Sequence, residues 1–215
     1  KQRSMKHTFI FAVLLAVVLP ATAQQFSLVE INPQQGTEAF LWSDSAKHVY
    51  GAGEFSSMVE LNGRLYFAAQ NSYYNYELWS TDGTQTGTQL VKELNVSGGS
   101  GIGKLHRVGN KIVFAATEDS LNSWNTPDYD LYVSDGTTSG TFKLMELNES
   151  SNVFLETGRV ATLQNKFIFC TATQVVATDG TPGGTLPLAA IAQYAQGFGY
   201  CEMNGHVYFV LVENG

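Results

Sequence analysis

Four carboxylates close together in the chain offer the clearest opportunity for chemistry. They are Glu118, Asp119, Asp128 and Asp130. Two carboxyl groups facing one bond are what a glycosidase uses as its acid and base, so Glu118 with Asp119, or Asp128 with Asp130, form candidate catalytic pairs. Carboxylate oxygens also bind calcium, although the ordered oxygen spacing of a known calcium loop is missing here. The sequence therefore leaves a hydrolase and a calcium site as alternatives, and indicates no other cofactor.

Other catalytic patterns are absent from the sequence. The four histidines share no metal-ligand spacing; they are His7, His48, His106 and His206. There is no H-E-x-x-H, no G-x-S-x-G and no glycine loop followed by a helix that would bind phosphate. These absences favour a function other than catalysis.

Three further aspartates belong to a repeated motif, D-G-T-x-x-G-T. The copies begin with Asp82-Gly83-Thr84, Asp135-Gly136-Thr137 and Asp179-Gly180-Thr181. An aspartate before a glycine accepts hydrogen bonds from backbone N–H groups just beyond it, and glycine adopts the positive φ that a tight turn requires. Catalysis needs one site, whereas these residues recur in every copy. We interpret them as structural turn residues, with catalytic or calcium-binding carboxylates as the alternative.

The repeated turn joins the second pair of strands in a longer repeat. Alternating apolar residues flank each D-G-T turn, and each copy is preceded by a second hairpin around an Asn-containing turn, as in Asn62-Gly63 and Asn204-Gly205. Four short strands per repeat are typical of β-propeller blades. The sequence predicts an all-β fold, a β-propeller of four-stranded antiparallel blades.

The predicted blades divide the chain after residue 23. They span roughly 56–94, 104–147 and 157–191, with an incomplete blade at 200–215. We expect Pro187 to interrupt the fourth strand of the third blade. Residues 26–31 resemble a last strand without its preceding strands and are predicted to close the ring. The chain thus contains about three and a half blades, fewer than a closed propeller has.

These repeats resemble those of a known family, the bacterial secreted proteins with the ELWxxDGT repeat. The sharpest copy runs from Glu77 to Leu94, and the resemblance covers about Phe26 to Val212. It implies a β-propeller in a large exported protein of Gram-negative bacteria, often with adhesion or sorting modules. It implies no single biochemical activity.

The N-terminus predicts export. Lys6 and His7 precede an apolar run from Phe9 to Leu19, and Ala21-Thr22-Ala23 resembles a signal-peptidase site. We predict a signal peptide that starts at Met5 and is cleaved after Ala23, so that residues 1–23 are absent from the mature chain. The apolar run is too short for a membrane anchor. The expected location is therefore the periplasm, the cell surface or the medium, with no stable membrane insertion.

The net charge narrows the class of possible partners, and the cysteines bear on disulfide formation. Removing the basic residues of segment 1–23 takes the formal charge from −7 to −10, which disfavours nucleic acid as a partner. Cys170 and Cys201 allow two interpretations in an oxidising compartment, a disulfide or two buried free thiols.

A binding surface is predicted on the variable loops. In an up-and-down blade the Asn turns and D-G-T turns lie on one face, and the longer, variable loops lie on the other. Aromatic and acidic side chains of these loops suit a glycan or an extracellular protein, unless each aromatic packs onto its own blade. The candidate binding residues are Tyr73, Tyr74, Trp124, Asp128, Tyr129 and Asp130. We therefore expect an exported, non-enzymatic scaffold or binding module, with the hydrolase as the alternative.

Overall fold

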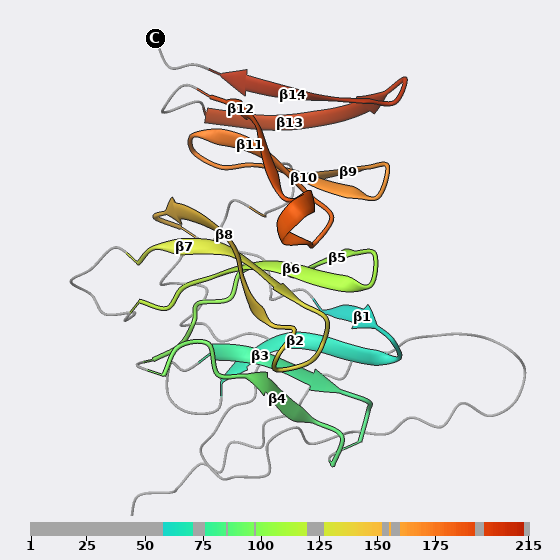
Figure 1. The fold of residues 1–215 in the computed structure, drawn as a ribbon, viewed down its shortest axis with the longest axis vertical. Helices are drawn as coiled ribbons and strands as arrows, with labels where there is room; N and C mark the ends of the chain where they lie inside the picture. Colours follow the sequence, from blue (N-terminus) through green and yellow to red (C-terminus); the bar gives the residue numbers. More distant parts are fainter. Residues whose placement is uncertain are drawn as a thin grey trace, which may run out of the picture.

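The computed structural model describes residues 58–70, 76–84, 86–96, 98–119, 127–151, 155, 160–191 and 196–212. The predicted signal peptide (1–23) and closing strand (26–31) lie outside these residues. The described part is all-β, as predicted, and contains three four-stranded antiparallel sheets and one two-stranded sheet. The sheets follow one another in chain order, with the first and last at opposite ends of the series (Figure 1).

Each sheet corresponds to one sequence repeat, and we call them units 1 to 4. Unit 1 contains β1 (Val59–Leu61), β2 (Arg64–Gln70), β3 (Tyr76–Thr81) and β4 (Gln89–Lys92). Unit 2 contains β5 (His106–Val108), β6 (Lys111–Ala116), β7 (Tyr129–Ser134) and β8 (Phe142–Glu149). Unit 3 contains β9 (Val160–Leu163), β10 (Lys166–Cys170), β11 (Gln174–Thr178) and β12 (Leu186–Ala190), with a short 3₁₀ helix, Pro182–Gly184, between the last two strands. Unit 4 contains β13 (Gln196–Met203) and β14 (His206–Val212).

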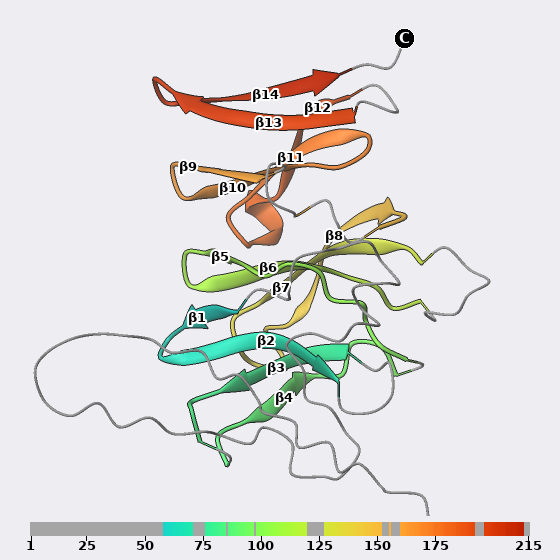
Figure 2. The ribbon, with the colours of Figure 1, turned by 180° about the vertical axis from the view of Figure 1, so that it is seen from behind.

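Strands pair in simple sequential order, and tight turns join the first strand to the second. Asn62 and Gly63 have φ angles of 52° and 75°, and Asn204 and Gly205 have 52° and 72°. Two consecutive positive φ values give a turn whose twist matches that of the flanking strands. The turns between the first two strands of the four sheets lie on the same side of the molecule (Figure 2).

The expectation that Pro187 interrupts the fourth strand is wrong. Pro187 lies inside β12, opposite Val176, where the register shifts between Val175 and Val176. β12 is an edge strand of its sheet. A proline is tolerated at a sheet edge because its missing N–H removes no hydrogen bond from the interior of the ladder.

The hydrophobic core lies between successive units. Phe114 and Tyr132 of unit 2 cluster with Tyr66 and Leu78 of unit 1. Phe167 and Phe169 of unit 3 pack with a second face of unit 2, which includes Val113 and Leu131. A third, smaller cluster joins Ile168 and Val175 of unit 3 to Val207 of unit 4. The sheet of unit 2 therefore packs against a neighbour on both faces, and the units depend on their neighbours for stability.

Candidate functional site

The three D-G-T turns have the same internal hydrogen bonds. In unit 1, Oδ1 of Asp82 accepts hydrogen bonds from the backbone N (2.9 Å) and the hydroxyl (2.7 Å) of Thr84. The Thr84 hydroxyl oxygen in turn accepts a hydrogen bond from the N–H of Gly87. The corresponding bonds recur around Asp135 and Asp179. These bonds stabilise the ionised carboxylate, so the threonine hydroxyl, followed by the backbone N–H, lowers the pKa of each aspartate.

The second glycine of the motif is required by close packing. A Cβ atom on Gly87, Gly140 or Gly184 would lie 1.9–2.0 Å from Oδ1 of the turn aspartate. Any side chain at this position would displace the carboxylate and its hydrogen bonds. The Oδ1 atoms of the motif aspartates are thus used within the turn itself.

Units 2 and 3 also use their D-G-T turns to contact the preceding unit. The Thr138 hydroxyl of unit 2 donates to the carbonyl oxygen of Val91 in β4, at 2.7 Å. Lys92 of β4 donates in return to the carbonyl oxygen of Thr141, at 2.6 Å. In the next pair of units, Lys111 of β6 donates to the carbonyl oxygen of Gly180 at 2.8 Å. The turns therefore join neighbouring units as well as neighbouring strands.

The Asn turns and the D-G-T turns lie at the same end of their sheets. Arg64, immediately after the Asn62-Gly63 turn, lies 3.7 Å from the carboxylate of Asp82. Lys166 lies 3.8 Å from Asp179 in unit 3. In an antiparallel four-stranded sheet this arrangement places the connections from second to third strand at the opposite end.

A buried carboxylate at the start of the third strand was not singled out by the sequence analysis. Glu77 is 0% exposed, and it accepts hydrogen bonds from the N–H groups of Leu94 (3.0 Å) and Asn95 (3.2 Å) and from the Ser100 hydroxyl (2.9 Å). Burial raises the pKa of the Glu77 carboxyl to about 7, despite these hydrogen bonds. The sequence repeat could have revealed Glu77, because Glu77 and Asp130 stand at the same offset before the turn aspartates Asp82 and Asp135.

Asp130 has the same structural role in unit 2, with a cationic partner added. Its Oδ1 accepts hydrogen bonds from the N–H groups of Leu147 (2.7 Å) and Asn148 (3.2 Å). Its Oδ2 lies 2.8 Å from the ammonium group of Lys143. The Asp130 side chain is therefore occupied in holding the end of β8 and is buried beneath it.

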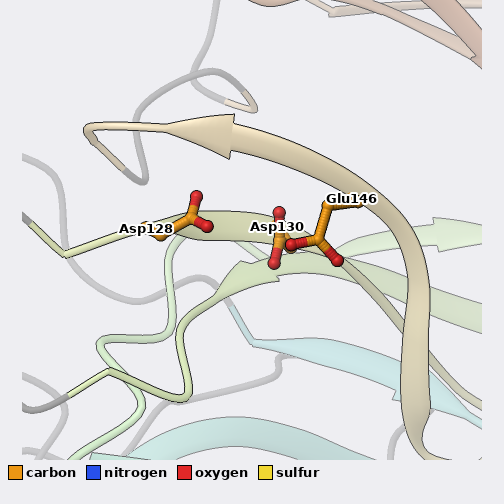
Figure 3. A group of neighbouring side chains, drawn as sticks. All are labelled: Asp128, Asp130 and Glu146. Atoms are coloured by element: carbon orange, nitrogen blue, oxygen red, sulfur yellow. The ribbon is translucent and has the colours of Figure 1, made fainter.

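Three carboxylates come together around this position (Figure 3). Asp128, Asp130 and Glu146 each have an oxygen within 4.8 Å of the others. Lys143 supplies the positive charge of the group, since its ammonium also lies 3.3 Å from Glu146. Burial, followed by the charges of Asp130 and Glu146, raises the pKa of Asp128. The three carboxylates have the oxygen atoms that a metal ion would bind. The ammonium group of Lys143, however, already provides a positive charge beside Asp130 and Glu146.

The structure describes some of the candidate binding residues, and these differ in how far they are buried. Tyr73, Tyr74 and Trp124 lie outside the described residues. Asp128 is partly exposed, whereas Tyr129 and Asp130 are buried. A Cβ atom on Gly101 would lie 2.6 Å from the Tyr129 hydroxyl, so Tyr129 packs beneath the connection between units 1 and 2.

Glu118 and Asp119, the other predicted carboxylate pair, form hydrogen bonds with different partners. Glu118 accepts a hydrogen bond from the Tyr132 hydroxyl at 2.7 Å. Oδ2 of Asp119 accepts one from the N–H of Asp128 at 2.9 Å. These bonds direct the two carboxylates to separate partners.

Both cysteines are free thiols in this structure. Cys170 is buried in β10 and Cys201 is exposed on β13. The interpretation as two buried thiols is therefore wrong for Cys201, and the alternative disulfide is not formed.

A scan against protein-family models and a search of curated proteins found no match to this chain. Within the described ranges, no helix is long and apolar enough to cross a membrane.

Proposed function

We propose that this chain is an exported, non-enzymatic scaffold of the β-propeller type, similar to bacterial ELWxxDGT-repeat proteins. Its variable-loop face contacts a glycan or an extracellular protein. The observation that carries the proposal is the use of every motif aspartate within its own turn, with a threonine hydroxyl and a backbone N–H as partners. A motif whose carboxylates are repeatedly satisfied in this way supports assembly of a framework rather than catalysis.

The variable connections support a binding role for the opposite end of the sheets. The segments between second and third strands span residues 71–75, 117–128 and 171–173, so their lengths differ among units of otherwise constant design. Variable loops on a regular scaffold are where binding residues concentrate. Two of these loops carry Tyr73, Tyr74 and Trp124, whose rings suit stacking on sugars or on a protein surface.

The test compares the mature chain, residues 24–215, with a variant in which Tyr73, Tyr74 and Trp124 are all replaced by Ala. Both are applied to a glycan array and to a panel of purified extracellular proteins, and any interaction is measured by calorimetry. We expect the variant to lose at least tenfold in affinity, because aromatic residues dominate such contacts. Ser139→Ala, on an exposed D-G-T turn, is the matched control and should bind normally.

The hydrolase alternative rests on the raised pKa of Asp128 beside Asp130. It is tested by incubating the glycans with the mature chain and measuring the release of reducing ends. Release that Asp128→Asn abolishes would overturn the non-enzymatic proposal. Binding that survives in the triple variant would overturn the assignment of the loop aromatics.

A further inference from the structure

His106 is a titratable side chain at the junction between units 2 and 3. It lies on β5 and stands opposite Val113 of β6, which belongs to the hydrophobic cluster between the two units. Its ring centroid is 4.7 Å from that of Phe167, a buried residue of β10 in unit 3. The imidazole therefore takes part in the packing of one unit on the next.

Units 1 and 3 have aliphatic residues where unit 2 has this histidine. The position lies three residues before the first residue of the turn that joins the first two strands, and it is Val59 in unit 1 and Ala161 in unit 3. Val59 packs against the cluster that joins units 1 and 2, and Ala161 is buried. A group that can gain a proton thus occupies a position that is otherwise apolar.

His106 also holds the segment that connects units 2 and 3. Leu155, between β8 and β9, is 0% exposed, and its carbonyl oxygen lies 2.6 Å from Nε2 of His106. A carbonyl oxygen only accepts hydrogen bonds, so Nε2 carries the proton of the neutral ring. Nδ1 is then the nitrogen that takes up a proton when the ring becomes charged.

A charged imidazole has no anionic partner among the described residues. None of the described carboxylates forms an ion pair with it. The charged side chains nearby are positive: Lys104 precedes β5, and Lys111, on the same face of β6 as Val113, donates to the carbonyl oxygen of Gly180 at 2.8 Å. The side chains that face the ring from β6, β10 and the connecting segment are apolar.

The neutral imidazole is consequently the form that fits this junction. Burial lowers the pKa of His106, because the charged ring would lose its hydration there. The hydrogen bond to the Leu155 carbonyl opposes this shift and is outweighed, and the charge of Lys104 adds to the lowering.

We propose that His106 makes the junction between units 2 and 3 sensitive to acid, because proton uptake at Nδ1 places an unpaired positive charge between the two units. The charged ring is released from Phe167 and from the Leu155 carbonyl, and unit 3 opens from unit 2. The contacts between units 1 and 2 use other residues and remain. This inference concerns the scaffold and is independent of the ligand.

The test measures amide hydrogen exchange of the mature chain, residues 24–215, at pH 7 and pH 5. Protection factors, which are corrected for the pH dependence of exchange itself, are compared between β10 in unit 3 and β2 and β3 in unit 1. His106→Gln keeps an N–H donor for the Leu155 carbonyl but does not titrate. His206→Gln, which removes an exposed imidazole on β14, is the matched control for the substitution itself.

We expect the protection of the β10 amides to fall at least about threefold between pH 7 and pH 5, because in this range the unfolded chain binds a proton at His106 more readily than the folded chain does. His106→Gln should remove most of this fall, and His206→Gln should retain it. The buried Glu77 cannot be the cause, since its raised pKa makes the folded protein more stable as the pH decreases.

Two results of the exchange experiment would overturn the proposal. An unchanged β10 protection at pH 5 would mean that the face of Phe167 and the Leu155 carbonyl stabilise the imidazolium as well as water does. An equal fall in units 1 and 3 would show that acid destabilises the whole protein rather than this junction.

A titration of the imidazole signals by NMR does not depend on the folding of His106→Gln. In the mature chain these signals come from His48, His106 and His206, and His48→Gln and His206→Gln assign the His106 signal by elimination. We expect His106 to titrate below the ordinary value of 6.5, and titration at or above that value would overturn the proposal. Failure of the glycan and protein screen would leave these outcomes unchanged, so the two proposals fail separately.

Discussion

Replacing Glu77 by Gln should change how the stability of this protein depends on pH. The carboxyl is fully buried, and within the described part of the chain no basic side chain lies within ion-pair distance of it. Its pKa is about 7 in the folded protein, against 4.5 for an ordinary glutamate. Between these values the folded state retains a proton that the unfolded state releases, so the free energy of unfolding falls as pH rises through this range.

The magnitude follows from the size of the shift. A difference of about 2.5 pKa units corresponds to about 3 kcal/mol lost by the wild type between pH 4.5 and pH 8. Gln has the shape of a protonated Glu and does not titrate. The NH2 group of Gln cannot accept the hydrogen bond that the Asn95 N–H donates to Oε1, so the variant should be less stable than the wild type by about 1–2 kcal/mol near pH 4.5. Because only the wild type loses stability as the pH rises, the difference should shift by about 3 kcal/mol in favour of the variant by pH 8.

Urea unfolding followed by tryptophan fluorescence, repeated from pH 4.5 to 8.5, measures this difference. Subtracting the variant from the wild type cancels the contributions of all other titrating groups. Glu202→Gln, which removes an exposed carboxyl on β13, is the matched control for the substitution itself. If the Glu77→Gln difference did not change with pH, the carboxylate would be stabilised by its three donors as fully as it is in water, and our argument from burial would be wrong.

Two further substitutions test the turns and the ion pair, each against a matched control. Gly184→Ala places a Cβ atom 2.0 Å from Oδ1 of Asp179 and should cost about 2 kcal/mol in urea unfolding, whereas Gly183→Ala, with no atom within 4 Å, should cost less than about 0.5 kcal/mol. Equal losses would mean that the Asp179 carboxylate does not need the space. Lys143→Met removes the ammonium beside buried Asp130 and should cost about 2 kcal/mol, but Lys166→Met, beside Asp179, whose side chain is 40% exposed, should cost less than about 1 kcal/mol. A Lys143→Met protein as stable as the wild type would show that the two backbone N–H groups suffice for Asp130.

The sequence by itself determined the repeat and its turns. Asn62-Gly63 and the D-G-T motif act through backbone torsions and hydrogen bonds that span a few residues, so their geometry follows from local chemistry. Alternation of apolar residues between such turns then required short antiparallel strands, and their regular spacing predicted four strands in a sheet.

Tertiary structure alone decided which side chains are buried between units. The burial of Tyr129 depends on Gly101 in the preceding connection, and the role of Glu77 depends on N–H groups at Leu94 and Asn95. The different exposure of Cys170 and Cys201 likewise depends on which face of a sheet the next unit covers. These are contacts between distant segments, and a periodic pattern gives a side chain's face of the sheet without giving what packs against it.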